Sequence, residues 1–448
     1  MSSSDQATVL VIIGITGDLA KRMLLPAIER IAKAGELPQD LRIVGITRRD
    51  VTAKDVLDGL PESKAGYDFV TKCLEMYQMD LEVESEYDTL KNHLADISKD
   101  FKQPAQNLFY LAVPPQISQP IIQCLGAVGF GKGTSTKLLL EKPFGEDLAT
   151  AQELVEQIQR HFHEDQVYRI DHFLAKEMAQ NLLVFRLGNS LFKRTWHKEF
   201  IERIEVMASE KIGIEGRVNF YEQTGALRDV VQSHLLQLAA LSLMELPSRS
   251  HWEGVPGHRL EALKSLRASR DKSGNLKATR AQYKGYDKEV SNPHTPTETF
   301  ALVELESTDP RWQGVPITLT TGKCLDRKYT EVRITYHQEE SGEANQLMLR
   351  VSPDEGIGFS IWSKRPGYGR EMESVELDYN YENTETNLPE AYERVFLDVI
   401  RSDHTLFTSS DEVLESWRIL EPIQKNWEMS ADNLIYYDKG SAAGDVSK

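Results

Sequence analysis

The chain has 448 residues, 40% of them hydrophobic and 27% charged, so it is long enough for two globular domains and has the composition of neither a disordered nor a fibrous protein. Its 52 basic and 69 acidic residues give a formal net charge of −17, which disfavours nonspecific binding to nucleic acid or to an anionic membrane. An anionic small-molecule substrate would therefore need a locally basic pocket.

The cysteines and the N-terminus indicate a reducing compartment. Cys73, Cys124 and Cys324 lie far apart without CxxC spacing, so we expect neither a disulfide framework nor a metal site. The N-terminal residues lack a basic region, and the apolar run of residues 9–15 is too short to span a bilayer. We therefore expect a cytoplasmic protein.

The first third of the chain has the pattern of a parallel sheet covered by helices. Residues 9–13 form an apolar, β-branched run that ends at Gly14, which is typical of a strand buried on both faces. Residues 19–34 have helical spacing, and residues 41–45 predict a second strand. Further buried strands are predicted at residues 107–113 and 136–140. This order favours a doubly wound, Rossmann-like domain, which we place at residues 1–175.

The pattern changes near residue 169, where a helical stretch to about residue 187 precedes an alternating strand at residues 200–208. Helices are predicted near residues 229–246 and 391–400, and the polar stretch 270–299 is interpreted as a surface excursion. Further strands are predicted at residues 298–306, 316–321, 330–337, 346–351 and 374–379. Residues 176–448 therefore predict an α+β domain with a large, mostly antiparallel sheet.

A glycine turn joins the first strand to the first helix. The turn reads Gly14-x-x-Gly17 and is followed by Asp18 and Leu19, which departs from the common G-x-G-x-x-G fingerprint. Backbone N–H groups and the helix dipole at such a place can hold a pyrophosphate. A glycine turn after a strand is also often only a turn.

The end of the second strand carries Arg48 and Arg49, where NAD enzymes tend to have an acidic residue that binds the ribose hydroxyls. Two arginines suit the 2′-phosphate of NADP. The alternative is a solvated charged loop in which Asp50 supplies a competing acid.

Asp171 and His172 are predicted to begin a helix that places His172 and Lys176 on one face, four residues apart. Two such side chains near a helix N-terminus could hold a phosphate, although an exposed His and Lys are more often a solvated face.

A second helical segment contains Asp229 and His234. His234 could act as a general base for alcohol oxidation if a carboxylate fixes its tautomer; otherwise it is a core histidine.

Lys142 follows the strand of residues 136–140 at the ligand-binding edge of the sheet. Lys323 and Lys328 form a basic pair beside another predicted strand.

Together these segments resemble the glucose-6-phosphate dehydrogenase family along nearly the whole chain. The stretches that carry the resemblance are Gly14-x-x-Gly17-Asp18-Leu19-Ala20-Lys21, Phe109-Tyr110-Leu111-Ala112-Val113-Pro114-Pro115, Glu141-Lys142-Pro143-Phe144-Gly145, Arg169-Ile170-Asp171-His172, Arg228-Asp229 with Gln232 and His234, Gly322-Lys323, and Ser402-Asp403-His404-Thr405-Leu406-Phe407.

The resemblance implies oxidation of glucose 6-phosphate to its lactone with NADP, in a homodimer or homotetramer. It implies that His234 removes the proton from the C1 hydroxyl and that Asp171 orients and stabilises the imidazolium. The implied phosphate-binding residues are His172, Lys176 and Lys328, and those for the sugar hydroxyls are Glu210, Asp229 and Lys323. Lys142 would lie between cofactor and substrate, and the implied cofactor residues are Gly14, Thr16, Gly17, Asp18, Leu19 and Arg48.

Three of the positions that depart from the pattern of the family match substrate positions. Phe173 replaces a usual tyrosine that helps to hold the phosphate, Met23 a usual lysine, and Ser233 a usual asparagine. Two alternatives therefore stay open: a paralogue that acts on another hexose phosphate, and a catalytically silent relative that binds cofactor or sugar phosphate.

Overall fold

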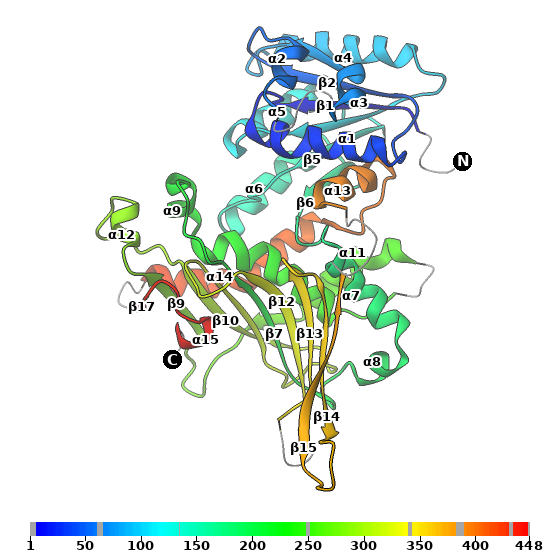
Figure 1. Cartoon of the computed structure of the whole chain (residues 1–448). Helices are drawn as coiled ribbons and strands as arrows, with labels where there is room; N and C mark the ends of the chain where they lie inside the picture. The colour runs from blue at the N-terminus through cyan, green and yellow to red at the C-terminus, as the bar shows by residue number, and fades with distance from the viewer. Residues whose placement is uncertain are drawn as a thin grey trace. The chain divides into compact units, whose positions relative to one another are not determined.

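The chain forms two compact units, drawn in the computed structural model of Figure 1. The structure describes residues 6–60, 66–133, 135–247, 251–338, 343–381, 389–429 and 433–446. The first unit comprises Met1–Gly145, Ala149–Ala175 and Pro389–Ser410, and the second comprises Glu146–Leu148, Lys176–Leu388 and Asp411–Lys448.

The first unit contains a parallel sheet that confirms the predicted Rossmann-like fold. Its strand order is β16-β6-β5-β4-β1-β2-β3, and only β16 runs antiparallel to its neighbour within the described residues. β1 and β5 are buried along their whole length because helices cover both faces of such a sheet. The strands are β1 (Thr8–Ile13), β2 (Leu41–Thr47), β3 (Leu74–Gln78), β4 (Gln106–Leu111), β5 (Thr136–Leu140), β6 (Val167–Ile170) and β16 (Phe407–Thr408).

The helices of this unit follow the apolar spacing of the sequence. The predicted helix at residues 19–34 is confirmed as a π-helical turn followed by an α-helix, and Gly35 follows it with a φ of 75°. The helices are η2 (Ala20–Leu24), α1 (Leu25–Lys33), α2 (Ala53–Leu57), α3 (Asp68–Cys73), α4 (Glu84–Lys99), α5 (Pro115–Ala127), α6 (Leu148–Gln159), η4 (Glu164–Gln166) and α13 (Ala391–Ile400).

Helix α13 lies in the first unit, although the sequence analysis placed residues 176–448 in one second domain. The helix itself agrees with the prediction, and it packs Tyr392, Phe396 and Ile400 into the core of the first unit. The Lys137 ammonium on β5 also donates to the Val399 carbonyl oxygen at 2.5 Å. An amphipathic pattern predicts an apolar face without indicating which core that face joins, so this assignment was outside the reach of the sequence.

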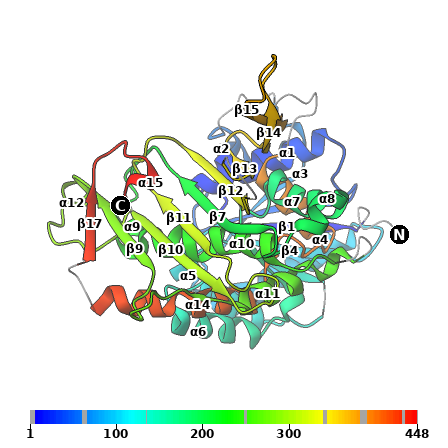
Figure 2. The ribbon, with the colours of Figure 1, turned by 90° about the horizontal axis from the view of Figure 1, so that it is seen from below.

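The second unit contains the predicted large, mostly antiparallel sheet (Figure 2). Its strand order is β15-β14-β13-β12-β7-β11-β10-β9-β17, and β8 pairs with β10 at the side. The pairs β7–β11 and β9–β17 are parallel. The strands are β7 (Ile201–Ser209), β8 (Leu266–Ala268), β9 (Ala278–Tyr283), β10 (Phe300–Ser307), β11 (Ile317–Gly322), β12 (Tyr329–Tyr336), β13 (Gln346–Ser352), β14 (Gly356–Lys364), β15 (Met372–Asn380) and β17 (Leu434–Tyr437).

Helix η5, which carries Asp229 and His234, packs against β7, β10 and β11 of this sheet. An ion pair between Arg259 and Glu412, 2.7 Å long and fully buried, joins α11 to α14. The helices of the second unit are α7 (Glu177–Gly188), α8 (Ser190–Thr195), α9 (Val218–Ala226), η5 (Leu227–Leu235), α10 (Leu236–Leu243), η6 (Trp252–Gly254), α11 (Val255–Lys264), α12 (Tyr286–Glu289), α14 (Ser410–Met429) and α15 (Ala443–Val446).

Two predicted segments were wrong. The helical stretch from residue 169 begins instead with β6, which pairs with β5, and the helix α7 starts only at Glu177. The polar stretch 270–299 contains a strand, β9, which pairs with β10 and β17. Both strands are short, and their burial is decided by partners that are distant in sequence.

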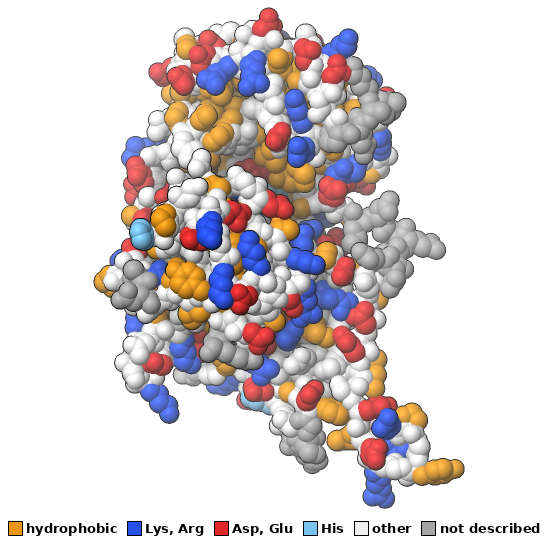
Figure 3. All heavy atoms as spheres, turned by 60° about the vertical axis from the view of Figure 1, so that its left-hand side comes forward, with side chains coloured by type: hydrophobic (Ala, Val, Ile, Leu, Met, Phe, Trp, Pro, Cys, Tyr) orange, Lys and Arg blue, Asp and Glu red, His pale blue; other side chains and the backbone are white. Residues whose placement is uncertain are grey.

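The surface carries both kinds of charge. On the face drawn in Figure 3, Lys and Arg side chains are interspersed with Asp and Glu side chains, so the acidic excess does not form one continuous acidic field there. Within the described ranges, no helix has both the length and the apolar character that crossing a membrane requires.

Candidate active site

The glycine turn lies where a parallel sheet of this type binds a dinucleotide. β1 stands between β4 and β2, so the strand order reverses at the carboxyl end of β1. Gly14 ends that strand with a φ of 94°, and a Cβ there would lie 2.4 Å from the Ala112 carbonyl oxygen. The Gly17 N–H donates to the Gly14 carbonyl oxygen at 2.9 Å, and the first helix follows at once. The turn therefore brings bare backbone and a helix N-terminus to one place, which fits a pyrophosphate.

Arg48 is exposed immediately after β2, the neighbour of β1. Arg49 is also exposed, and its N–H donates to the Thr47 hydroxyl oxygen at 3.2 Å. The strand order thus brings the two arginines to the edge of the sheet that holds the glycine turn. A 2′-phosphate would meet cationic side chains at this edge.

His172 belongs to a cluster at the carboxyl ends of β4, β5 and β6 that the sequence did not predict. Its Nε2 lies 3.2 Å from Glu141 Oε2, and Nδ1 has no hydrogen-bond partner within the part of the chain that the structure describes. The Tyr110 hydroxyl donates to the other Glu141 oxygen, and the Tyr392 ring lies 4.5 Å from the imidazole between centroids. The cluster fixes the orientation of the His172 ring and leaves a buried Nδ1 without a hydrogen bond among the described residues.

Burial alone would raise the pKa of the Glu141 carboxyl. Hydrogen bonding and charge from His172, together with the Tyr110 hydroxyl and the Lys142 ammonium, outweigh burial and lower that pKa below its usual value. Glu141 is therefore a carboxylate at neutral pH and can hold the imidazole. Glu141 and Tyr110 both stand in the stretches that carry the family resemblance, but their contact joins residues 31 apart.

Asp171 and His172 do not begin a helix, so the expected helical face shared by His172 and Lys176 was wrong. Asp171 directly follows β6 and is 3% exposed, and its Oδ1 accepts the Phe173 N–H at 2.9 Å. Lys176 precedes α7 in the second unit, where its Nζ lies 3.9 Å from Glu355 Oε1. A strand followed by a tight turn keeps the two cations on different elements.

Glu210 and Lys323 form an ion pair in the second unit. They follow β7 and β11, which are parallel neighbours, so both residues lie at the same edge of the sheet. Lys323 Nζ lies 2.6 Å from Glu210 Oε2 and 5.1 Å from the centroid of the Tyr221 ring. The Lys323 side chain is 3% exposed. Lys328 is exposed in the turn between β11 and β12.

Asp229 and His234 lie on a π-helical segment, in which each backbone hydrogen bond spans five residues. The two residues are five positions apart, so this winding turns them toward the same side of the helix, whereas α-helical winding would separate them. His234 is buried at 8% exposure, and Asp229 is half-buried. Helix π-turns occur frequently at functional sites. His234 is therefore a buried residue of the second unit, whereas Asp171 belongs to the first.

Among the described residues, no group of three or more His, Cys, Asp or Glu side chains is arranged to hold a metal ion.

Two family descriptions match the chain. "Glucose-6-phosphate dehydrogenase, NAD binding domain" covers residues 11–181, and "Glucose-6-phosphate dehydrogenase, C-terminal domain" covers residues 183–448. The glucose-6-phosphate 1-dehydrogenase of Bacillus subtilis is 33% identical over 97% of this chain and 94% of its own length. The enzyme of the same name from Rhizobium meliloti is 35% identical over 96% and 93%.

Solved structures agree with these matches. A glucose-6-phosphate dehydrogenase in complex with its substrate glucose 6-phosphate superposes with a TM-score of 0.90 at 29% identity, covering 100% of this chain and 99% of that one. Glucose-6-phosphate 1-dehydrogenase from Mycobacterium avium gives a TM-score of 0.84 at 30% identity, covering 99% and 96%. The yeast regulator Gal80p, with a TM-score of 0.56 at 10% identity, shows the fold alone.

Proposed function

The chain belongs to the glucose-6-phosphate dehydrogenase family, and on that premise we propose that it oxidises glucose 6-phosphate to 6-phosphoglucono-1,5-lactone with NADP in the oxidative pentose phosphate pathway. The observation that carries this proposal is the pairing of Glu210 with Lys323 beside the helix of Asp229 and His234, on a chain whose other unit has the glycine turn of a dinucleotide site.

In the proposed reaction His234 accepts the proton of the C1 hydroxyl as the C1 hydride departs. Asp171 orients the imidazole and stabilises the imidazolium. When bound, NADP supplies the nicotinamide C4 that accepts the hydride. The substrate thus loses one hydride and one proton, and C1 becomes the carbonyl carbon of the lactone.

The substrate would be held by both ends. We assign its phosphate to His172, Lys176 and Lys328, and its hydroxyls to Glu210, Asp229 and Lys323. His172 suits the phosphate because its contact with Glu141, 3.2 Å from Nε2, fixes the orientation of the imidazole ring. Lys142, which follows β5, would lie between substrate and nicotinamide.

The cofactor would lie on the first unit. Gly14, Thr16, Gly17, Asp18 and Leu19 would hold the pyrophosphate, and Arg48 would hold the 2′-phosphate. The glycine turn at the carboxyl end of β1, followed directly by the first helix, supports this assignment.

One assay with glucose 6-phosphate and each cofactor, read at 340 nm, tests the proposal. Strong absorbance with NADP supports it. A panel of other hexose phosphates in the same assay tests the paralogue that Met23, Phe173 and Ser233 suggest. No turnover with any sugar phosphate, but binding of NADP in calorimetry, would instead identify a silent relative.

Replacing Arg48 with alanine should raise the Michaelis constant for NADP by about 10- to 100-fold, because one charge-assisted hydrogen bond contributes about 1.5–3 kcal/mol. The Michaelis constant for NAD should change little, since NAD lacks the 2′-phosphate. Initial-rate kinetics with both cofactors check this, and Arg42→Ala, at an exposed position on the same strand, is the matched control. Equal effects on both cofactors would remove the 2′-phosphate role.

Self-association in the cytoplasm is also part of the proposal. β15 carries Met372, Leu377 and Tyr379, all more than half exposed, and burial alternates along β10 and β13 so that one set of side chains faces outward. Partly open apolar sheet surfaces of this kind suit contact between copies. Sedimentation velocity should therefore give a dimer or tetramer, and a monomer at micromolar concentration would contradict the assignment.

A further inference from the structure

Helix η5 begins without a capping side chain of its own. Its N-terminal flanking residue is Ala226, whose side chain cannot accept a hydrogen bond, although the first turns of a helix leave several N–H groups without partners. The preceding Gly225 is not helical, with a φ of 62° and a ψ of −177°, so α9 and η5 are separated by a kink. The start of the helix that carries Asp229 and His234 must therefore be held from elsewhere.

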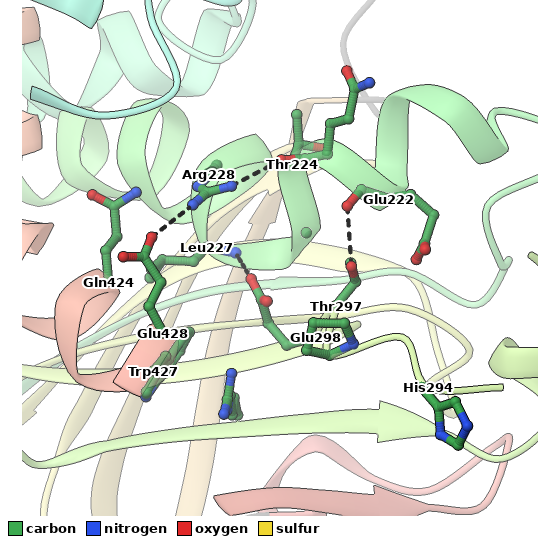
Figure 4. Close-up of a pocket in the computed structure, with 14 residues that line it drawn as sticks. Glu222, Thr224, Leu227, Arg228, His294, Thr297, Glu298, Gln424, Trp427 and Glu428 are labelled. Carbon is green, nitrogen blue, oxygen red and sulfur yellow. Dashed lines mark hydrogen bonds and ion pairs between the residues drawn. The ribbon is translucent and has the colours of Figure 1, made fainter. Parts of the chain in front are cut away.

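Glu298 supplies the missing contacts from the residue pair that leads into β10. Its backbone carbonyl oxygen accepts the Ala226 N–H at 3.0 Å, and its side-chain Oε1 accepts the Leu227 N–H at 2.9 Å. Figure 4 shows the Glu298 side chain pointing toward Leu227 at the beginning of the helix. An acidic side chain at this end also complements the helix dipole.

Gly225 leaves room for the Glu298 carboxyl group because it has no side chain. A Cβ on Gly225 would lie 2.5 Å from Glu298 Oε1 and 2.8 Å from Oε2. Any larger residue would have to displace the carboxyl group and would also adopt an unfavourable backbone conformation. The two residues therefore form a single fitted contact.

The same short segment also fixes Lys323. Thr299, the next residue, accepts the Lys323 N–H at 2.9 Å through its carbonyl oxygen, and the Phe300 of β10 pairs with Gly322. One rigid segment thus touches the first turn of the helix, two residues before Asp229, and the backbone of Lys323. Asp229 and Lys323 are two of the residues assigned above to the sugar hydroxyls.

We propose that Glu298 is a positioning residue that caps the helix of Asp229 and His234 and holds Asp229 in register with Lys323 for binding of the sugar. The proposal rests on the proposed function for the identity of the ligand. Because Asp229 lies in the first turn and His234 lies further along the helix, loss of the cap disturbs sugar binding more than proton transfer.

Burial raises the pKa of the Glu298 carboxyl, and the Leu227 N–H together with Arg228 and Arg280 offsets this only in part. The amide oxygen of a glutamine, which has the same length, can accept the same Leu227 N–H, so glutamine is the conservative replacement. The carboxyl group lines a cavity of about 500 Å³ with Arg228, Trp427 and Glu428 (Figure 4).

The test is steady-state kinetics of Glu298→Ala. Loss of a helix cap costs about 0.5–2 kcal/mol, so the Michaelis constant for glucose 6-phosphate should rise about 3- to 30-fold while kcat and the constant for NADP stay within about threefold. Glu298→Gln should restore most of the affinity. Glu298→Asp, which keeps the charge but is one methylene too short, should show the defect even if the alanine variant fails to fold, and Gly225→Ala should show it too.

Glu428→Gln is the matched control, because Glu428 lines the same cavity, is 64% exposed and pairs with Arg228 without touching a helix N–H. Its Michaelis constants should equal those of the wild type. A wild-type constant for glucose 6-phosphate in both Glu298→Ala and Glu298→Asp, or equal defects in Glu298→Gln and Glu298→Ala, would overturn the positioning role.

Amide hydrogen exchange separates this inference from the proposed function. Exchange at Leu227 should accelerate at least about tenfold in Glu298→Ala and stay near the wild-type rate in Glu298→Gln. If the wild type turns over no glucose 6-phosphate, the proposed function fails while exchange still decides whether the cap exists. Unchanged exchange in the alanine variant would remove the cap even if the wild type is active.

Discussion

Replacing His234 with asparagine is expected to lower kcat by about 10²–10⁴-fold, because a positioned general base contributes a factor of that size. Asparagine has a similar shape and can hydrogen bond, but it does not accept a proton at neutral pH. His234 is only 8% exposed, so a polar replacement of similar size also preserves the packing of the helix. The Michaelis constants should therefore change by less than about threefold.

Initial-rate kinetics over a range of pH measure this effect. In the wild type, protonation of the base should lower kcat/KM at acid pH. This acid-side fall should be absent from the His234→Asn variant. His294→Asn is the control, because His294 is exposed on the same unit and has no assigned role. A wild-type kcat in the His234→Asn variant would refute the base assignment and favour the alternative that His234 is only a core histidine.

The stability of the protein is expected to fall by a few kcal/mol between about pH 4 and pH 7 through Asp398 alone. Burial, together with the nearby Asp403, raises the pKa of this carboxyl to about 7, although Arg394 and Arg401 oppose the rise. An unfolded aspartate has a pKa of about 3.9. Between these values the folded protein keeps a proton that the unfolded chain loses, so the free energy of unfolding decreases as the pH rises.

Asp398→Asn should remove this part of the dependence, because an amide of the same shape carries no charge at any of these pH values. Thermal unfolding at half-unit steps from about pH 3.5 to pH 8 gives the comparison, with Asp96→Asn as the exposed control, since its side chain is 70% exposed. The melting temperatures of Asp398→Asn should converge with those of the wild type at low pH and exceed them at high pH. Parallel curves for the two proteins would contradict the argument.

The sequence predicted those parts of the fold that depend on local pattern. The continuous apolar run before Gly14 is strand β1, and the helical apolar spacing of residues 391–400 is helix α13, because each pattern lies within one element. β9 and β6 were missed, since a strand of four to six residues gains its burial from partners far along the chain. The same limit explains why α13 could not be assigned to the core that it joins.

The candidate site divides in the same way. Glu210 and Lys323 could be predicted from the family resemblance, and the parallel pairing of β7 with β11 brings them together. The turn at Asp171 could not be predicted, because helical spacing and a strand followed by a turn look alike over so few residues. Glu141 and Glu298 were also missed. Each acts through contacts with residues 31 or more positions away, and such contacts leave no periodic signal in one sequence.

The return of the chain to its first unit at Pro389–Ser410 sets the order in which the protein can be completed on the ribosome. Until residue 408 has been synthesised, β6 lacks its outer neighbour β16, and the core lacks the apolar face of α13. An unpaired strand edge beside exposed apolar side chains is prone to aggregate. A premature stop codon anywhere before residue 389 would therefore disable the nucleotide-binding half of the molecule, although its sheet is encoded almost entirely in the first 170 codons.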